Sequence, residues 1–453
     1  MPPSSGSLGR RVATNTSAAI IDLLLTKVAN VLVFVLLVRI LGTADIAAIG
    51  VATGYLVFLL YLDVSPIRVM LRDYARLSQD VVRTNRLLSA LSLFWIGQCG
   101  AMVLVCAFLV GFVLPRLSLP ALAFLYVALT IDFIALTLRD WVKTLYYAGL
   151  RHGTATKISI AENAVRLSCL LLVLYLPHIE TYAWLLIALA IGSCAVWVGA
   201  LLAHFRFRPI FDRHTLPLLQ HSLTDYGLWD HLNRTAIDTL LTIDTIILSW
   251  YAEAPEIAAY AIALRFTSLL LLLPTQLHRG LQVALSNLQS EEKRAEAANS
   301  ALKLCAAIGL AQLLAVAVAG DWILWVLFGA SATREVYVYT VIITVAVTAM
   351  IPSWPVLSII NNFGSLREAF RLVFLPAMLV GLPMYVLSAA YAGGLGMALA
   401  KVVVYAGLGG ALMLFCAKKC PFPLQVTVLS PREKALLREL FWQQPLGWWW
   451  RER

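Results

Sequence analysis

The chain has 453 residues, of which 60% are hydrophobic and 13% are charged. Soluble proteins carry about 25% charged residues, so this composition excludes a soluble globular protein and indicates a membrane protein with many spans. The net charge of +10 does not indicate a nucleic-acid partner, because the basic residues gather in alternate loops between the apolar stretches.

Helices that cross a bilayer need about 20 apolar residues, and the sequence offers twelve such stretches. In chain order they cover residues 15–41, 46–63, 87–114, 119–138, 158–176, 182–203, 224–250, 257–277, 302–319, 336–359, 370–391 and 395–416. We therefore predict an all-α polytopic membrane protein with about twelve transmembrane helices. Prolines within three of the C-terminal stretches (257–277, 336–359 and 370–391) predict kinks, which serve either as hinges or as ordinary packed bends.

Lysine and arginine predict the orientation of these spans. Most of the 35 basic residues fall on the cytoplasmic side when the N-terminus is inside, and both termini are then cytoplasmic. The first span is too long for a cleavable signal peptide. The seven cysteines and seven histidines lack the spacing of a metal site, so we expect no disulfide, no metal and no other cofactor.

A recurring segment indicates two similar halves. Residues 45–52 read DIAAIGVA, and residues 256–263, which lie 211 positions later, read EIAAYAIA. Six predicted spans separate the two copies, so the halves share one orientation and form a parallel repeat. We predict a cytoplasmic N-terminus (1–14), an N-terminal six-helix lobe (15–203), a cytoplasmic linker (204–223), a C-terminal six-helix lobe (224–416) and a cytoplasmic tail (417–453) with an interfacial helix.

Five cations lie inside these apolar stretches: Lys27, Arg166, Arg234, Arg265 and Lys401. A charge at the centre of a membrane helix costs roughly 2.5 to 3.5 kcal/mol on insertion scales. Such residues face a water-filled cavity or a partner of opposite charge. Four of them, Lys27, Arg265, Arg234 and Arg166, are our candidates for binding an anionic substrate.

Two of the five cations have carboxylates one turn away on their own helix. Glu162 lies four residues before Arg166, and Arg234 lies between Asp230 and Asp238 at the same spacing. Residues four apart lie on the same helical face. We therefore expect Arg166, and to a lesser degree Arg234, to be neutralised within its own helix.

The other three cations, Lys27, Arg265 and Lys401, need partners from other helices. Lys401 lies near the outer end of the last span, where a lysine can extend to the interface. Lys27 lies near the middle of the first span, and the repeat offset of 211 places Asp238 at the equivalent position. We predict that Lys27 faces Asp238 across a central cavity.

Three carboxylates within spans are candidates for binding a coupling proton or sodium ion: Asp238, Asp244 and Asp22. A further carboxylate, Asp132, also lies in a span, and nothing in its local sequence places it at a cavity.

Three segments resemble a known family. Residues 37–42 (LVRILG), residues 244–248 (DTIIL) with 257–265 (IAAYAIALR), and residues 326–329 (VLFG) are similar to segments of polysaccharide transporters in the multidrug/oligosaccharidyl-lipid/polysaccharide (MOP) exporter superfamily. The resemblance implies an O-antigen flippase, with twelve helices in two lobes, that moves an undecaprenyl-pyrophosphate-linked oligosaccharide to the outer leaflet of the inner membrane. It implies membrane lipid, a polysaccharide polymerase and chain-length machinery as partners. It also gives Lys27 and Arg265 a role at the pyrophosphate or an acidic sugar.

Two other classes of function are open alternatives. A cation-coupled multidrug antiporter of the same superfamily is expected to have an acidic cavity, whereas the buried residues of this chain include unpaired cations. A membrane-embedded glycan-modifying enzyme needs a His/Asp or Ser/His group at one face of the membrane, and we find none in the sequence. The sequence therefore favours a transporter over an enzyme.

Overall fold

The structure is a computed structural model that describes residues 26, 29–64, 81–148, 152–170, 175, 178–205, 209–210, 217, 228–287 and 290–419. Every regular element in this part of the chain is helical. Seven of its stretches are long and apolar enough to cross a membrane. The all-helical membrane fold is confirmed, whereas the arrangement in twelve spans and two lobes stays a prediction.

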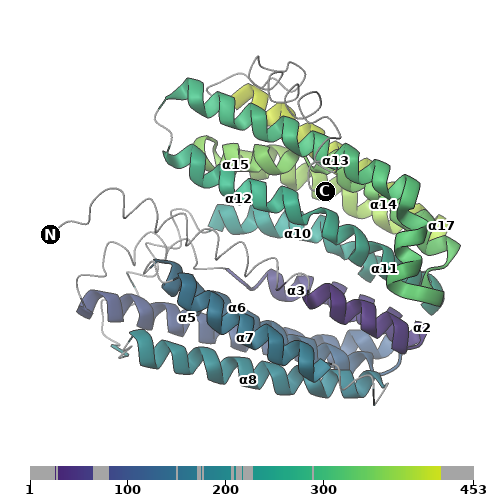
Figure 1. Cartoon of the computed structure of the whole chain (residues 1–453), viewed down its shortest axis with the longest axis horizontal. Coiled ribbons are helices and arrows are strands. Elements are labelled where there is room, and N and C mark those ends of the chain that lie inside the picture. The colour runs from purple at the N-terminus through teal and green to yellow at the C-terminus, as the bar shows by residue number, and fades with distance from the viewer. Residues whose placement is uncertain are drawn as a thin grey trace, which may run out of the picture.

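The N-terminal helices gather on one side of the molecule (Figure 1). They are the helix Ala29–Ile40, α2 (Thr43–Tyr55), α3 (Val57–Leu60), α5 (Val81–Phe108), α6 (Leu122–Ala148), α7 (His152–Leu170) and α8 (Ile179–Phe205). A π-helical turn, η1 (Leu109–Val113), and a 3-10 turn, η2 (Leu114–Arg116), follow α5. Pro115 lacks the N–H that an α-helix would direct at residue 111, and the backbone widens into η1 just before it.

The C-terminal helices form the other side of the molecule (Figure 1). They are α10 (Leu228–Leu248), α11 (Ala254–Leu270), α12 (Leu272–Asn287), α13 (Glu291–Phe328), α14 (Arg334–Met350), α15 (Ser353–Phe363), α16 (Leu366–Ala369) and α17 (Leu375–Lys419). A 3-10 turn, η5 (Gly329–Ser331), follows α13, and a π-helical turn, η6 (Phe370–Phe374), precedes α17.

Prolines interrupt the C-terminal helices where the sequence predicts kinks. The helix α11 ends at Leu270, four residues before Pro274. A proline ring clashes with the carbonyl four positions earlier in a helix, so α11 cannot continue through Pro274. Pro352 is the cap between α14 and α15, and Pro376 directly follows η6. Pro383 lies inside α17. The predicted spans 257–277 and 336–359 are therefore each built from two helices.

A tight bend divides α17 between residues 391 and 395, which separates the predicted spans 370–391 and 395–416. Gly393 has φ 53° and ψ −138°, a conformation that only glycine adopts readily. The carboxylate of Glu256, at the start of α11, accepts a hydrogen bond of 2.6 Å from the backbone N–H of Gly394. A Cβ atom at Gly393 would lie 2.5 Å from that carboxylate. The bend therefore depends on both residues.

The two copies of the recurring segment pack against each other where the two sides of the molecule meet. A Cβ atom on Gly50 of α2 would lie only 2.6 Å from the Cβ of Ala261 on α11. Positions 50 and 261 are 211 apart, so they are equivalent in the proposed repeat. Two equivalent positions in contact are what a two-fold axis through this point requires. Glycine here allows the helix backbones to approach closely.

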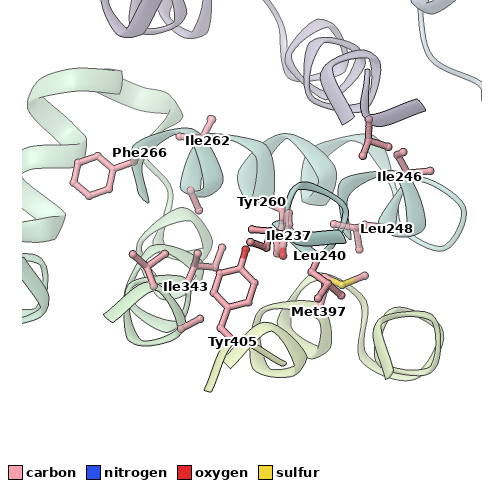
Figure 2. Packing of buried hydrophobic residues seen from close by; sticks show 14 of the residues in the cluster. Ile237, Leu240, Ile246, Leu248, Tyr260, Ile262, Phe266, Ile343, Met397 and Tyr405 are labelled. Atoms are coloured by element: carbon pink, nitrogen blue, oxygen red, sulfur yellow. The ribbon is translucent and has the colours of Figure 1, made fainter. Parts of the chain in front are cut away.

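Aromatic rings fill the core of the C-terminal side. Tyr260 of α11 and Tyr405 of α17 are fully buried, and Figure 2 shows the hydroxyl of Tyr405 directed at the group formed by Tyr260, Ile237 and Leu240. The rings of Tyr260 and Tyr339 meet edge to face with centroids 5.9 Å apart, an arrangement that aromatic pairs prefer. Four helices, α10, α11, α14 and α17, are thereby fixed to one another.

Large apolar side chains cover much of the outer surface. Val318 is 79% exposed and Trp322 is 66% exposed on α13, and Leu104 is 72% exposed on α5. Apolar patches of this kind are unfavourable in water and are satisfied by lipid. The exposed side chains and the seven candidate spans identify a multi-pass membrane protein.

Candidate functional site

A cavity of ≈ 240 Å³ lies between the two sides of the molecule. Side chains and backbone of α2, α10, α11, α14 and α17 line it, together with Phe34 of the helix Ala29–Ile40. Its charged or hydroxyl-bearing lining residues are Thr53, Thr242, Thr245, Arg265, Thr267, Ser268, Lys401 and Tyr405.

Arg265 of α11 is the exposed cation of this cavity. Its side chain is accessible to solvent although it lies within an apolar helix. The guanidinium group donates a hydrogen bond of 3.1 Å to the hydroxyl of Thr53 on α2. It also lies 5.6 Å from the centre of the Phe34 ring, within the range of a cation–π interaction. Arg265 therefore faces a cavity, as the sequence predicts for a membrane cation.

Two neighbours from the N-terminal side fix the position of this guanidinium. Thr53 donates its own proton to the carbonyl of Ile49 at 2.7 Å, which leaves its oxygen lone pairs for Arg265.

A second cavity of ≈ 120 Å³, between the helix Ala29–Ile40 and α11 to α13, also reaches Arg265 and Phe34. The same guanidinium is thus accessible from two cavities.

Lys401 of α17 forms an ion pair with Asp244 of α10. Only 1% of the lysine side chain and 0% of the aspartate side chain are exposed. The expectation that Lys401 extends to the interface is wrong, because a carboxylate and the carbonyl of Leu241, 3.1 Å from its ammonium group, provide a partner in the interior. Asp244 also accepts hydrogen bonds from the hydroxyl of Tyr260 at 2.7 Å and from the N–H of Thr245 at 2.9 Å.

Arg166 of α7 does not pair with Glu162, and this prediction is wrong. Arg166 forms an ion pair with Asp132 of α6. Glu162 instead accepts hydrogen bonds from Ser193 at 2.6 Å and Trp197 at 2.9 Å, both on α8. Donors from a neighbouring helix satisfy Glu162, so Arg166 turns to the carboxylate of α6. The pair holds α6 and α7 together, away from the central cavity.

Arg234 pairs with Asp238 on its own helix, as predicted. The two groups lie 3.5 Å apart and are half and one-third exposed, so the pair contributes little stability. Arg234 lines a smaller cavity of ≈ 190 Å³ with Asp63 and Asp140. Lys27 and Asp22 lie outside the described residues, so the pairing of Lys27 with Asp238 stays a prediction.

The described cations of the apolar helices occupy two kinds of position, at the central cavity and outside it. Arg265 and Lys401 line the central cavity, and Asp244 lies behind Lys401. Arg166 and Arg234 lie elsewhere, each beside a carboxylate. Among the described residues that line the central cavity there are two cations and no aspartate or glutamate. The lining can therefore attract an anion.

Three residues that contact the charged groups, Thr53, Phe34 and Tyr260, were not predicted from the sequence. A threonine or an aromatic residue in an apolar helix is ordinary, and nothing local marks it as a contact of a charged group. The repeat was the one available signal, since Thr53 directly follows the first copy and Arg265 lies two positions after the second copy.

Two of the segments that resemble the transporter family meet at the end of α13. Arg39 donates hydrogen bonds to the carbonyls of Leu327, at 2.7 Å, and Val326. Ser331 donates to the carbonyl of Val38 at 3.2 Å. The carbonyls of Val326 and Leu327 lie in the last turn of α13, the negative end of the helix dipole. We call this contact the Arg39 latch; it joins the N-terminal and C-terminal sides.

Comparison with known proteins decides the family. The family model described as Polysaccharide biosynthesis protein matches residues 12–278, more than half of the chain. The chain belongs to this family. The resemblance to polysaccharide transporters of the MOP superfamily is thereby confirmed. No curated protein sequence matches the chain.

Solved structures support the same fold. An inward-facing multidrug resistance MATE family transporter of the MOP superfamily matches with a TM-score of 0.68 and 11% identity, over 90% of this chain and 95% of that chain. The lipid II flippase MurJ, in an inward closed conformation, matches with a TM-score of 0.64 and 14% identity, over 87% and 86%. A MOP superfamily transporter from Pyrococcus furiosus, described as having a binding pocket of reverse polarity, matches at 0.61 and 12%, over 90% and 94%. The fold is that of this transporter superfamily.

Proposed function

We propose that the protein is a flippase for an oligosaccharide linked through a diphosphate to an undecaprenyl carrier. It moves an O-antigen or exopolysaccharide repeat unit from the inner to the outer leaflet by alternating access, coupled to an ion. Membership of a polysaccharide biosynthesis family supports the glycan. The fold shared with a lipid II flippase supports the lipid carrier.

The charge of the central cavity is the observation that carries this proposal. Two cations, Arg265 and Lys401, and no carboxylate line it among the described residues. Asp244 neutralises Lys401 from behind the wall, so Arg265 is the cation that gives the lining its positive charge. A diphosphate is a dense anion, and the planar guanidinium of arginine offers it several donors in a fixed geometry. The same cavity disfavours a multidrug antiporter, whose cationic drugs would meet repulsion. A transporter rather than a glycan-modifying enzyme is the function that family and fold support.

Alternating access needs two lobes that rock about a central contact. We assign residues 15–203 and 224–416 to these lobes, each with six helices and related by the parallel repeat. The close contact of Gly50 with Ala261 lies at the centre, and the Arg39 latch lies at the outer side in the predicted orientation. The protein would reside in the inner membrane with both termini in the cytoplasm.

The test follows the lipid-linked oligosaccharide in cells that lack the gene and carry a variant. Loss of the gene should leave the oligosaccharide on the inner leaflet, and the wild type should restore export. Arg265→Ala should lower export about tenfold or more, because a charge-assisted hydrogen bond is lost. Arg265→Lys should be intermediate, since lysine keeps the charge without the fork.

The matched control is Arg334→Ala, which removes an exposed arginine at the start of α14, away from the cavity. It should export like the wild type. If Arg265→Ala exports as well as Arg334→Ala at equal protein levels, the cavity does not bind the substrate. If loss of the gene strands no oligosaccharide, the proposed function is wrong.

A further inference from the structure

A buried ion pair lies directly behind the wall of the central cavity. Lys401 lines the cavity, and the Asp244 carboxylate that neutralises it is completely buried. Replacing a buried ion pair by apolar residues is often neutral or stabilising. Stability alone therefore does not account for a lysine and an aspartate at this position.

The hydrogen bonds of Asp244 divide into two kinds. The hydroxyl of Tyr260 and the N–H of Thr245 belong to α11 and to α10 itself, and neither depends on α17. The third donor is the Lys401 ammonium, which belongs to a side chain at the cavity wall. Thr245 also lines the cavity, but its donor to Asp244 is a backbone N–H fixed in α10. An anion in the cavity thus competes with Asp244 for the Lys401 ammonium.

Other ionisable groups around Asp244 are phenols. Tyr385 and Tyr405 of α17 and Tyr260 of α11 are fully buried beside it, and Tyr339 of α14 contacts the Tyr260 ring. The ring of Tyr405 also lies 5.3 Å from the Lys401 ammonium. Neutral phenols cannot replace the positive charge of lysine. If Lys401 turns away, a proton is the smallest charge that can neutralise the carboxylate.

We propose that Lys401 is the second cation for the diphosphate of the substrate, and that Asp244 takes up a proton when Lys401 turns from it to the phosphate. Arg265 and Lys401 line one cavity from α11 and α17, so both are available to an anion held in it. This inference rests on the proposed function, and it identifies how binding of the lipid diphosphate is coupled to a proton.

The exchange balances in charge and atoms. Lys401 keeps its three protons, and its hydrogen bonds move from the carboxylate to phosphate oxygens. The one bond formed is the O–H of the Asp244 carboxyl. The bond broken is an O–H of a hydronium ion from the solution, which is left as neutral water. The carbonyl of Leu241 and the Asp244 carboxylate both lie within hydrogen-bond reach of the same ammonium, so the carbonyl released by Lys401 is a nearby acceptor for the new O–H.

The experiment measures binding and proton uptake together on the purified full-length protein in detergent. The ligand is farnesyl diphosphate, a short lipid diphosphate, and farnesol is the control without phosphate. A weakly buffered, mildly alkaline solution with a pH indicator is used, because the diphosphate is then already ionised. The wild type should bind the diphosphate and take up about one proton per bound ligand.

Variants separate the two cations from the proton site. Lys401→Met should weaken binding about tenfold or more. Asp244→Asn should bind at least as well as the wild type, because Lys401 is released, but should take up no proton. The double variant Lys401→Met with Asp244→Leu removes both charges, so its folding does not depend on an unpaired buried charge; it should bind like Lys401→Met, again with no proton uptake.

The outcomes distinguish this inference from the proposed function. If Arg265→Ala weakens binding while Lys401→Met does not, or if Asp244→Asn takes up as many protons as the wild type, the inference is overturned and the proposed function stands. If the wild type binds farnesol as well as farnesyl diphosphate, or binds neither, the anion site of the proposed function is overturned as well.

Discussion

The Arg39 latch should control how often the two sides of the molecule separate at the end of α13. Arg39→Ala removes two hydrogen bonds to the carbonyls of Val326 and Leu327. The remaining contacts there are the bond from Ser331 to Val38 and the edge-to-face contact of Phe34 with Phe328. The latch is therefore weakened but not abolished.

The expected magnitude follows from the exposure of Arg39. A hydrogen bond to a charged group contributes about 1.5 to 3 kcal/mol when it is protected, but Arg39 is exposed, and solvent screening leaves about 1 kcal/mol for the pair of bonds. A difference of about 1 kcal/mol shifts the ratio of closed to open states roughly fivefold.

Pulsed electron spin resonance can measure this shift. Spin labels at Thr43→Cys and Ala330→Cys, in a background without the seven native cysteines, report the distance between the start of α2 and η5. Both positions are exposed. Arg39→Ala should increase the population at long distance, and the control Arg334→Ala should not. Equal distance distributions for Arg39→Ala and the wild type would refute the latch.

Two predictions concern glycines at close contacts. Gly50→Ala should destabilise the protein by about 1 to 3 kcal/mol through overpacking against Ala261. The double variant Gly50→Ala with Ala261→Gly should restore the melting temperature in detergent. The control Gly97→Ala, where the new Cβ meets open space, should not lower the melting temperature. Gly393→Ala should lower the free energy of unfolding by about 1 to 3 kcal/mol, because residue 393 has a positive φ. The same melting assay measures this loss. Equal melting temperatures for Gly393→Ala and for Gly410→Ala, where the new Cβ meets open space, would contradict the structural role of the bend.

Much of the fold follows from local features of the sequence. Apolar length predicts membrane helices, because the bilayer leaves no water for the backbone and each helix satisfies its own hydrogen bonds. Pro274 marks the end of α11 because a proline ring acts on the carbonyl four residues before it, and Pro352 lies between α14 and α15. The boundary between residues 391 and 395 coincides with the bend at Gly393. These effects act within one or two turns, so they are readable from the chain alone.

The candidate site was predictable only in part. Arg265 was identified because a cation in an apolar helix needs water or a partner, and the pair of Arg234 with Asp238 followed from helical spacing. The partner of Arg166 was not, because Asp132 competes with Glu162 from a different helix. A charged side chain selects the nearest unsatisfied partner in space, and helical spacing gives only one of the candidates.

The sequence by itself determined that this protein is a helical membrane protein, that it resembles polysaccharide transporters and that cations lie within its spans. Only the tertiary structure decided which cations face a cavity. Lys401 and Asp244 are 157 residues apart, and Thr53 and Arg265 are 212 residues apart. Such contacts depend on which helices pack together, and that is settled by the fit of whole helix surfaces rather than by any local pattern.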